Sequence, residues 1–201
     1  MAGQNQHNET EIKLRVGSAA EAIRRLAAAG FRESKARGFE TNELLDSPEA
    51  PLRERGEVLR LREFRGEAVV TYKGRAAAGG RHKSREELET RVNDGAAMRL
   101  IFARLGYQST YRYEKFRTEF VRPGEIGGDD GVATVDETPI GVFMELEGTP
   151  AWIDRMAAAM GFADSEFVTD SYSTLYRQHC DAQGIEVGEG MVFSGEAPGR
   201  H

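Results

Sequence analysis

Polar and apolar residues alternate along several short stretches of this chain, and the polar positions are mostly charged. Side chains two positions apart in a β-strand lie on the same face. In the first such stretch, Glu9, Glu11 and Lys13 therefore share one face, while Ile12 and Leu14 share the other. The same alternation of charged and apolar positions recurs down the chain, which predicts strands with one charged face and one apolar face.

The charged faces contain two kinds of group. Carboxylates come in pairs at Glu9/Glu11, Glu87/Glu89 and Glu145/Glu147, and cations come in pairs at Arg60/Arg62 and Lys115/Arg117, with Lys13 and Lys73 beside them. The charged faces of ordinary sheets point to bulk water and seldom favour one chemistry. A repeated choice of carboxylates and cations therefore indicates a common site.

Turn and capping signals divide the chain into strands and four helices. Ser18 and Glu21 form a capping box that predicts a first helix ending near Gly30. The other helices are expected over 94–106, 150–161 and about 170–180. Strands are expected near 9–14, 35–45, 58–64, 68–73, 84–92, 107–121 (as one or two strands), 131–137 and 142–148.

About eight strands in hairpin order, each apolar on one face and charged on the other, predict an α+β fold built on an eight-stranded antiparallel β-barrel. The apolar faces would pack under helices on the outside of the barrel. The charged faces would then line its lumen. Ionised groups in a lumen are costly unless they pair or bind a charged ligand.

Composition limits the remaining possibilities. The 201 residues suit one domain, which we place at 1–180, followed by a glycine-rich and flexible tail at 181–201 in which Met191–Phe193 could dock. No apolar run reaches the ~18 residues of a membrane span, and no secretory signal is visible. One cysteine, Cys180, excludes an internal disulfide and a Cys-based zinc site. These features predict a cytoplasmic protein.

The balance of charge narrows the choice of ligand. A formal charge of −6 argues against a nucleic-acid partner, which favours a basic surface. Paired carboxylates repel each other unless a divalent cation joins them, and all-oxygen ligand sets suit Mg²⁺ or Mn²⁺. Clustered Arg and Lys suit phosphate oxygens. Together they predict a site for a small polyphosphate carried with its metal.

The order of these motifs resembles the CYTH family, also called triphosphate tunnel metalloenzymes. This family includes class IV adenylyl cyclases, thiamine triphosphatases and inorganic tripolyphosphatases. The matching segments run in family order from Glu9 to about Leu175. They are Glu9-x-Glu11-x-Lys13, Leu59-Arg60-Leu61-Arg62, Thr71-Tyr72-Lys73, Arg85-x-Glu87-x-Glu89, Lys115-Phe116-Arg117, Asp136 with Gly141-x-Phe143-x-Glu145-x-Glu147, and Ser171-Tyr172-x-x-Leu175. Phe39-Glu40-Thr41-Asn42 departs from the commoner aromatic-Asp-Thr segment, which leaves the wall that faces a base or alcohol unassigned.

The resemblance implies a role for each matching residue. Lys13, Lys73 and Asp136 would serve in catalysis, with Asp136 in metal binding or proton handling. The triphosphate would be bound by Lys13, Arg60, Arg62, Lys73, Arg85, Lys115 and Arg117. The metal would be held by Glu9, Glu11, Glu145 and Glu147, with Glu87 or Glu89 contributing. For Arg85, pairing with the neighbouring glutamates is an equal alternative, and Tyr172 is read as a packing anchor.

Three functions remain open from the sequence. The first is a metal-dependent hydrolase of a small triphosphate such as tripolyphosphate, thiamine triphosphate or a nucleoside triphosphate. The second is a class IV adenylyl cyclase, which would release pyrophosphate from ATP. The third is a polyphosphate-binding module without turnover. Hydrolysis makes the fewest demands on the site and is preferred; no membrane partner is expected, and a homodimer is possible on family grounds.

Overall fold

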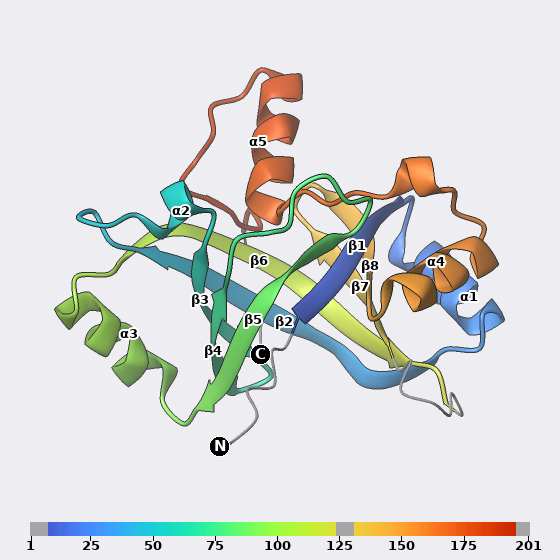
Figure 1. Ribbon diagram of the computed structural model, residues 1–201, viewed down its shortest axis with the longest axis horizontal. Coiled ribbons are helices and arrows are strands. Elements are labelled where there is room, and N and C mark those ends of the chain that lie inside the picture. The colour runs from blue at the N-terminus through green and yellow to red at the C-terminus, as the bar shows by residue number, and fades with distance from the viewer. Residues whose placement is uncertain (1–7, 124–130, 196–201) are drawn as a thin grey trace.

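The computed structural model describes residues 8–123 and 131–195, in which eight antiparallel strands form a closed barrel with helices outside it (Figure 1). The strands follow one another around the barrel in the order β2-β3-β4-β5-β1-β8-β7-β6, and pairing of β2 with β6 closes it. The elements are β1 (Asn8–Val16), α1 (Ala19–Ala28), β2 (Arg32–Asp46), α2 (Leu52–Arg55), β3 (Val58–Phe64), β4 (Glu67–Lys73), β5 (Lys83–Val92), α3 (Gly95–Arg104), β6 (Gln108–Val121), β7 (Val132–Thr138), β8 (Gly141–Glu147), α4 (Pro150–Ala159), the 3₁₀ turn η1 (Asp164–Glu166), α5 (Tyr172–Gln183) and β9 (Gly190–Met191). The predicted fold is confirmed.

Two long strands make the seam of the barrel. β2 and β6 pair along nearly their whole lengths, from Arg32 opposite Val121 to Asp46 opposite Gln108. β6 is one continuous strand, which decides between the one or two strands expected there. Register shifts interrupt the pairing near Lys35 and Leu44, and such irregularities bend a strand as barrel closure requires.

Local signals in the sequence place several elements correctly. The Ser18 hydroxyl accepts a hydrogen bond from the Glu21 backbone N–H at 3.2 Å, so the first helix begins where the capping box predicts. The Glu21 carboxylate accepts from the Gly17 N–H, one residue before the expected partner. At the β3–β4 turn, Arg65 (φ 52°) and Gly66 (φ 78°) both adopt positive φ, the conformation that a two-residue hairpin favours.

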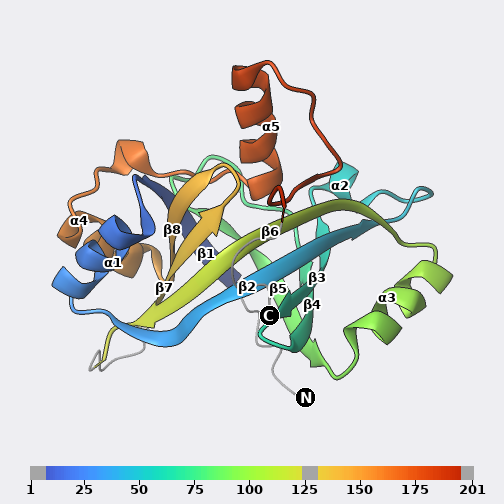
Figure 2. The ribbon, with the colours of Figure 1, turned by 180° about the vertical axis from the view of Figure 1, so that it is seen from behind.

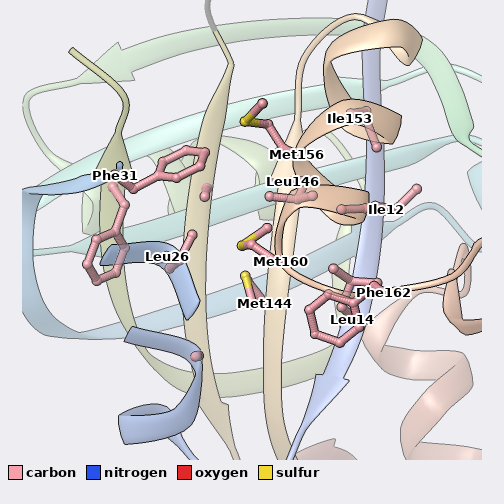
Figure 3. Close-up of a cluster of buried hydrophobic side chains, with 14 of the residues drawn as sticks. Ile12, Leu14, Leu26, Phe31, Met144, Leu146, Ile153, Met156, Met160 and Phe162 are labelled. Carbon is pink, nitrogen blue, oxygen red and sulfur yellow. The ribbon is translucent and has the colours of Figure 1, made fainter. Parts of the chain in front are cut away.

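The main hydrophobic core lies outside the barrel wall rather than inside it. This core fills the space between the barrel strands and the helices α1 and α4 (Figure 3). Its fully buried side chains include Ile12 and Leu14 of β1, Leu26 of α1 and Leu146 of β8. Met156 of α4 packs in the same cluster. Because alternate residues of β1 and β8 enter this core, the intervening charged residues must point into the lumen. Burial of the apolar faces therefore orients the site.

The first part of the segment expected as a flexible tail, residues 181–191, contains regular secondary structure. Helix α5 continues through Gln183, three residues past the expected domain boundary. Gly190 and Met191 then pair with Arg112 and Tyr113 of β6, in parallel. Met191 is fully buried, so the prediction that this segment docks is confirmed. Residues 124–130, between the strands expected at 107–121 and 131–137, and residues 196–201 of the expected tail lie outside the described residues.

Candidate active site

A cavity of about 530 Å³ lies inside the barrel, and its lining is overwhelmingly charged. It brings together thirteen of the fourteen residues singled out from the sequence. These are Lys13, Arg60, Arg62, Lys73, Arg85, Lys115 and Arg117, with Glu9, Glu11, Glu87, Glu89, Glu145 and Glu147. Asp136 is the exception. Of the described residues, Lys83, Tyr113, Glu119, Thr134 and Tyr172 are among those that complete the lining.

Strand pairing explains why distant residues meet. Glu11 of β1 lies opposite Glu147 of β8, and Lys13 lies opposite Glu145. On the other side, Lys73 of β4 lies opposite Glu87 of β5. Residues directly across an antiparallel pair have Cβ atoms about 5 Å apart, so the pairing brings charged groups of different strands within reach of one another. Two of these pairs join a cation to a carboxylate, and Glu11 with Glu147 joins two carboxylates.

Lys73 holds two carboxylates at one end of this network. Its ammonium nitrogen lies 2.6 Å from Glu9 Oε2 and 2.8 Å from Glu87 Oε2. Burial raises the pKa of Glu9 to about 7; the hydrogen bond with Glu87 and the charges of Glu11 and Glu87 add to the rise, while Lys73 opposes it. A second cation near Glu9 would stabilise the ionised carboxylate and lower its pKa.

Lys83 is a site residue that the sequence reasoning missed. Its Nζ lies 3.3 Å from Glu11 Oε1, and it lies opposite Glu11 in the β1–β5 pairing. Burial lowers the pKa of Lys83 to about 8; the charges of Lys13 and Arg85 act in the same direction, and Glu11 opposes them. Residues 74–83 read as a glycine-rich loop, but the two-residue spacing from Lys83 to Arg85 and Glu87 was a signal that β5 begins earlier.

Asp136 lies behind the cations and does not line the cavity. It is fully buried and accepts from Lys115 Nζ at 2.8 Å and from Arg117 Nε at 2.7 Å. The hydroxyl of Tyr172 also donates to it, at 2.8 Å. The carboxylate is thus enclosed by donors, and the structure places it where it orients Lys115 and Arg117.

Glu40 supports the same two cations from β2. It is fully buried, with Oε1 3.3 Å from Lys115 Nζ. Burial alone would raise its pKa, but the charges of Lys115, Arg117 and Arg62 hold the pKa of Glu40 down, at about 2. The departure from the family pattern in strand two therefore places another buried carboxylate beneath the site. Phe39 and Thr41 of this segment line a separate groove, together with Arg65 and Asn93.

Three arginines retain unused donors within the described structure. Arg60 donates to the Thr71 hydroxyl at 3.1 Å, and Arg62 donates to Glu89 at 3.3 Å. The Nε atoms of Arg60, Arg62 and Arg85 are nevertheless buried without a hydrogen-bond partner. Buried donors left unsatisfied cost about 1–3 kcal/mol each, more when they are charged. Because all three side chains line the cavity, phosphate oxygens that enter it would meet guanidinium groups with unused donor capacity.

The carboxylates fit a hard divalent cation in chemistry, because they offer oxygen ligands only. Within 8–123 and 131–195, however, no three of them are already grouped as a ligand set. Mg²⁺ characteristically takes one or two carboxylates and completes its shell with water and substrate phosphate. No helix in these two ranges is long and apolar enough to cross a membrane.

A closed antiparallel barrel whose lumen is lined by ordered cations and carboxylates defines the class of triphosphate tunnel proteins. The CYTH domain family matches residues 7–152, and this chain belongs to that family.

Comparison with individual proteins agrees with this assignment. A "Putative adenylate cyclase" of Methanocaldococcus jannaschii is 31% identical over 140 residues, covering 69% of this chain and 75% of that protein. A structure described as a "putative adenylate cyclase" from Vibrio parahaemolyticus superposes with a TM-score of 0.69 at 19% identity, covering 83% of this chain and 96% of that one. An adenylyl cyclase-like protein from Hippeastrum, described by its "dominant" triphosphatase activity, gives 0.58 at 16% identity, covering 90% and 98%. At these identities the two structures show a shared fold.

Proposed function

We propose that the protein hydrolyses a small triphosphate, such as tripolyphosphate, thiamine triphosphate or a nucleoside triphosphate, with Mg²⁺ or Mn²⁺. The observation that supports this most directly is that Arg60, Arg62 and Arg85 line the charged cavity while their Nε atoms have no hydrogen-bond partner among the described residues. Guanidinium groups are the side chains best suited to bind phosphate oxygens. The cavity volume of about 530 Å³ is in the usual range for a small-molecule site.

Each group of side chains has a definite task in this reaction. Arg60, Arg62, Lys115 and Arg117 bind the phosphate oxygens, and Lys73 orients the Glu9 and Glu87 carboxylates. The carboxylates Glu9, Glu11, Glu87, Glu89, Glu145 and Glu147 form the pool of metal ligands. A bound divalent cation would stabilise negative charge on the phosphate oxygens in the transition state.

The chemical step requires little covalent participation from the protein. A water oxygen forms a bond to the terminal phosphorus, and the bond between that phosphorus and the bridging oxygen breaks. The bridging oxygen leaves with the rest of the substrate and its electron pair, and the proton released by the water passes to solvent. Tripolyphosphate would yield phosphate and pyrophosphate. Fixed cations around the phosphoryl group lower the barrier because they need no reorganisation as charge develops.

A class IV adenylyl cyclase is the second candidate, favoured by the name given to the Methanocaldococcus relative. In that reaction the ribose 3′-hydroxyl attacks the α-phosphorus of ATP, and pyrophosphate leaves. The same cations and carboxylates could bind ATP. Hydrolysis is preferred because it needs no residue that orients adenine, and the description of the Hippeastrum protein shows that both activities have been considered for one barrel.

One incubation separates these functions. The protein is mixed with equal amounts of ATP and inorganic tripolyphosphate in Mg²⁺ or Mn²⁺, and products are resolved by anion-exchange chromatography. Loss of tripolyphosphate to phosphate and pyrophosphate supports the proposal, and cyclic AMP with pyrophosphate would replace it with the cyclase. If neither substrate is consumed with any metal while calorimetry detects bound tripolyphosphate, the protein is a binding module. A Lys73→Met preparation controls for contaminating phosphatases.

A further inference from the structure

Helix α5 stands on the barrel with its N-terminal end towards the strands (Figures 1 and 2). Its first residue, Tyr172, is only 6% exposed, and both Tyr172 and its neighbour Ser171 line the cavity. The family model matches residues 7–152, and Tyr172 belongs to the Ser171-Tyr172-x-x-Leu175 segment further along the chain. The sequence predicts a packing anchor, and Tyr172 does pack in a buried cluster with Phe143 and Leu175. The same side chain also lines the charged cavity.

The ring of Tyr172 contacts cations from two separate strands. Lys13 Nζ of β1 lies 5.3 Å from the ring centroid, and Lys115 Nζ of β6 lies 5.1 Å from it. These strands are separated around the barrel by β8 and β7. Both distances are within the ~6 Å over which an aromatic face attracts an ammonium group. A single ring, supplied by a helix that lies outside the strands, thus contacts two sides of the lumen.

The hydroxyl of Tyr172 forms a hydrogen bond with Asp136, the carboxylate that also accepts from Lys115. It donates to Asp136 Oδ2 at 2.8 Å, the atom to which Lys115 also donates. Burial, together with the charges of Asp136 and Glu145, raises the pKa of Tyr172 well above its usual value, so the hydroxyl remains a donor. The orientation of the Tyr172 ring and the position of the Lys115 ammonium group are consequently coupled, because both groups donate to Asp136 Oδ2.

We propose that Tyr172 is a positioning residue for the phosphate site, holding the ammonium groups of Lys13 and Lys115 in place for an anionic ligand. This inference rests on the proposed function, since it concerns how the same cavity binds its triphosphate. Lys13 and Lys115 are each 3% exposed or less and carry like charge. Lys13 already contacts Glu11 at 3.3 Å and Lys115 already contacts Asp136 at 2.8 Å. Without the ring, each ammonium group keeps these carboxylate contacts but loses the aromatic surface that limits its position on the side facing Tyr172.

The test measures binding of inorganic tripolyphosphate by isothermal titration calorimetry. Tyr172→Leu removes the aromatic face, and Tyr172→Phe removes only the hydroxyl. We expect Tyr172→Leu to weaken binding about tenfold, as two lost ammonium–ring contacts imply, and Tyr172→Phe to weaken it about threefold. Phe143→Leu is the matched control: Phe143 is fully buried and packs edge-on against Tyr172 at 5.5 Å, but it does not line the cavity. It should bind as wild type does.

A double-mutant cycle shows whether Tyr172 acts through the cations. In a Lys115→Met background, Tyr172→Leu should cost less than about threefold, because one of its two partners is already gone. Equal losses in both backgrounds would contradict the proposal. So would wild-type affinity in a folded Tyr172→Leu variant. If the wild-type protein itself does not bind tripolyphosphate, both the proposed function and this inference are wrong. If the wild-type protein binds tripolyphosphate and Tyr172→Leu has the same affinity, only the positioning role is wrong.

Discussion

Glu40 and Lys115 are strand partners on β2 and β6, and their side chains meet inside the barrel with 3.3 Å between Oε1 and Nζ. Asp136 approaches Lys115 from β7 at 2.8 Å. One buried ammonium is therefore held between two carboxylates from opposite sides. This arrangement gives Lys115 a fixed position before any ligand arrives, which is the preorganisation that phosphate binding benefits from.

Glu40→Gln should destabilise the protein by about 2 kcal/mol, because Lys115 and Arg117 lose a buried counter-charge while Asp136 remains. Urea denaturation followed by circular dichroism measures this change. Glu43→Gln on the same strand is the control. Its partner Arg99 is 42% exposed, so the loss there should stay below about 1 kcal/mol. Equal losses in the two variants would contradict the buried-pair interpretation.

Acid should remove the contribution of Glu40. Its pKa in the folded protein is about 2, below the unfolded value of 4.5. The unfolded chain therefore binds more protons between these values, so the stabilisation is complete above about pH 4.5 and is lost as pH falls towards 2. Unfolding free energies measured from pH 5 to pH 3 should decline more steeply for wild type than for Glu40→Gln. Parallel curves would show that other carboxylates dominate acid unfolding.

Lys73→Met should lower turnover of the triphosphate by about 100-fold or more, because Lys73 orients Glu9 and Glu87 and contributes a fixed charge to the lumen. Initial rates with tripolyphosphate give the measurement, and circular dichroism checks the fold. Glu9→Gln should have a similar effect. Lys35→Met is the control, since Lys35 is half-exposed and pairs with Glu119. Wild-type rates in a folded Lys73→Met variant would exclude the lumen as the active site.

Lys83 should make tripolyphosphate binding sensitive to pH. Its pKa is lowered to about 8, so the free protein loses this positive charge as pH rises through that value. The advantage of wild type over Lys83→Met in affinity should therefore shrink between about pH 7 and pH 9, measured by calorimetry. Lys83→Arg keeps its charge and should preserve the advantage throughout. A constant ratio for wild type would contradict the lowered pKa.

Met191→Ala should cost about 2–4 kcal/mol of stability, because the side chain is fully buried against β6 and α5. Val192→Ala is the matched control one residue away, where the side chain is 45% exposed and a change within about 0.5 kcal/mol is expected. Thermal or urea denaturation distinguishes them. Equal and small effects would indicate that the 190–193 segment does not stabilise the barrel.

The sequence by itself determined the barrel and most of the candidate site. Two-residue alternation is a property of each strand alone, so Glu9, Glu11 and Lys13 could be assigned to one face without knowing their neighbours. The Ser18 cap and the Arg65-Gly66 turn are equally local. Lys83 was not assigned to the site, because the glycine-rich residues before it suggested a loop and β5 begins one residue earlier than expected.

Only the tertiary structure decided which groups meet. Whether Asp136 faces the cavity or lies behind Lys115 and Arg117 depends on pairing between β6 and β7, which no local pattern specifies. The position of Tyr172 at Lys13 and Lys115 depends on how α5 packs across the barrel, and the docking of Met191 depends on a free stretch of β6. These relationships arise from long-range contacts, whereas strand faces and helix caps are encoded by neighbours in the chain.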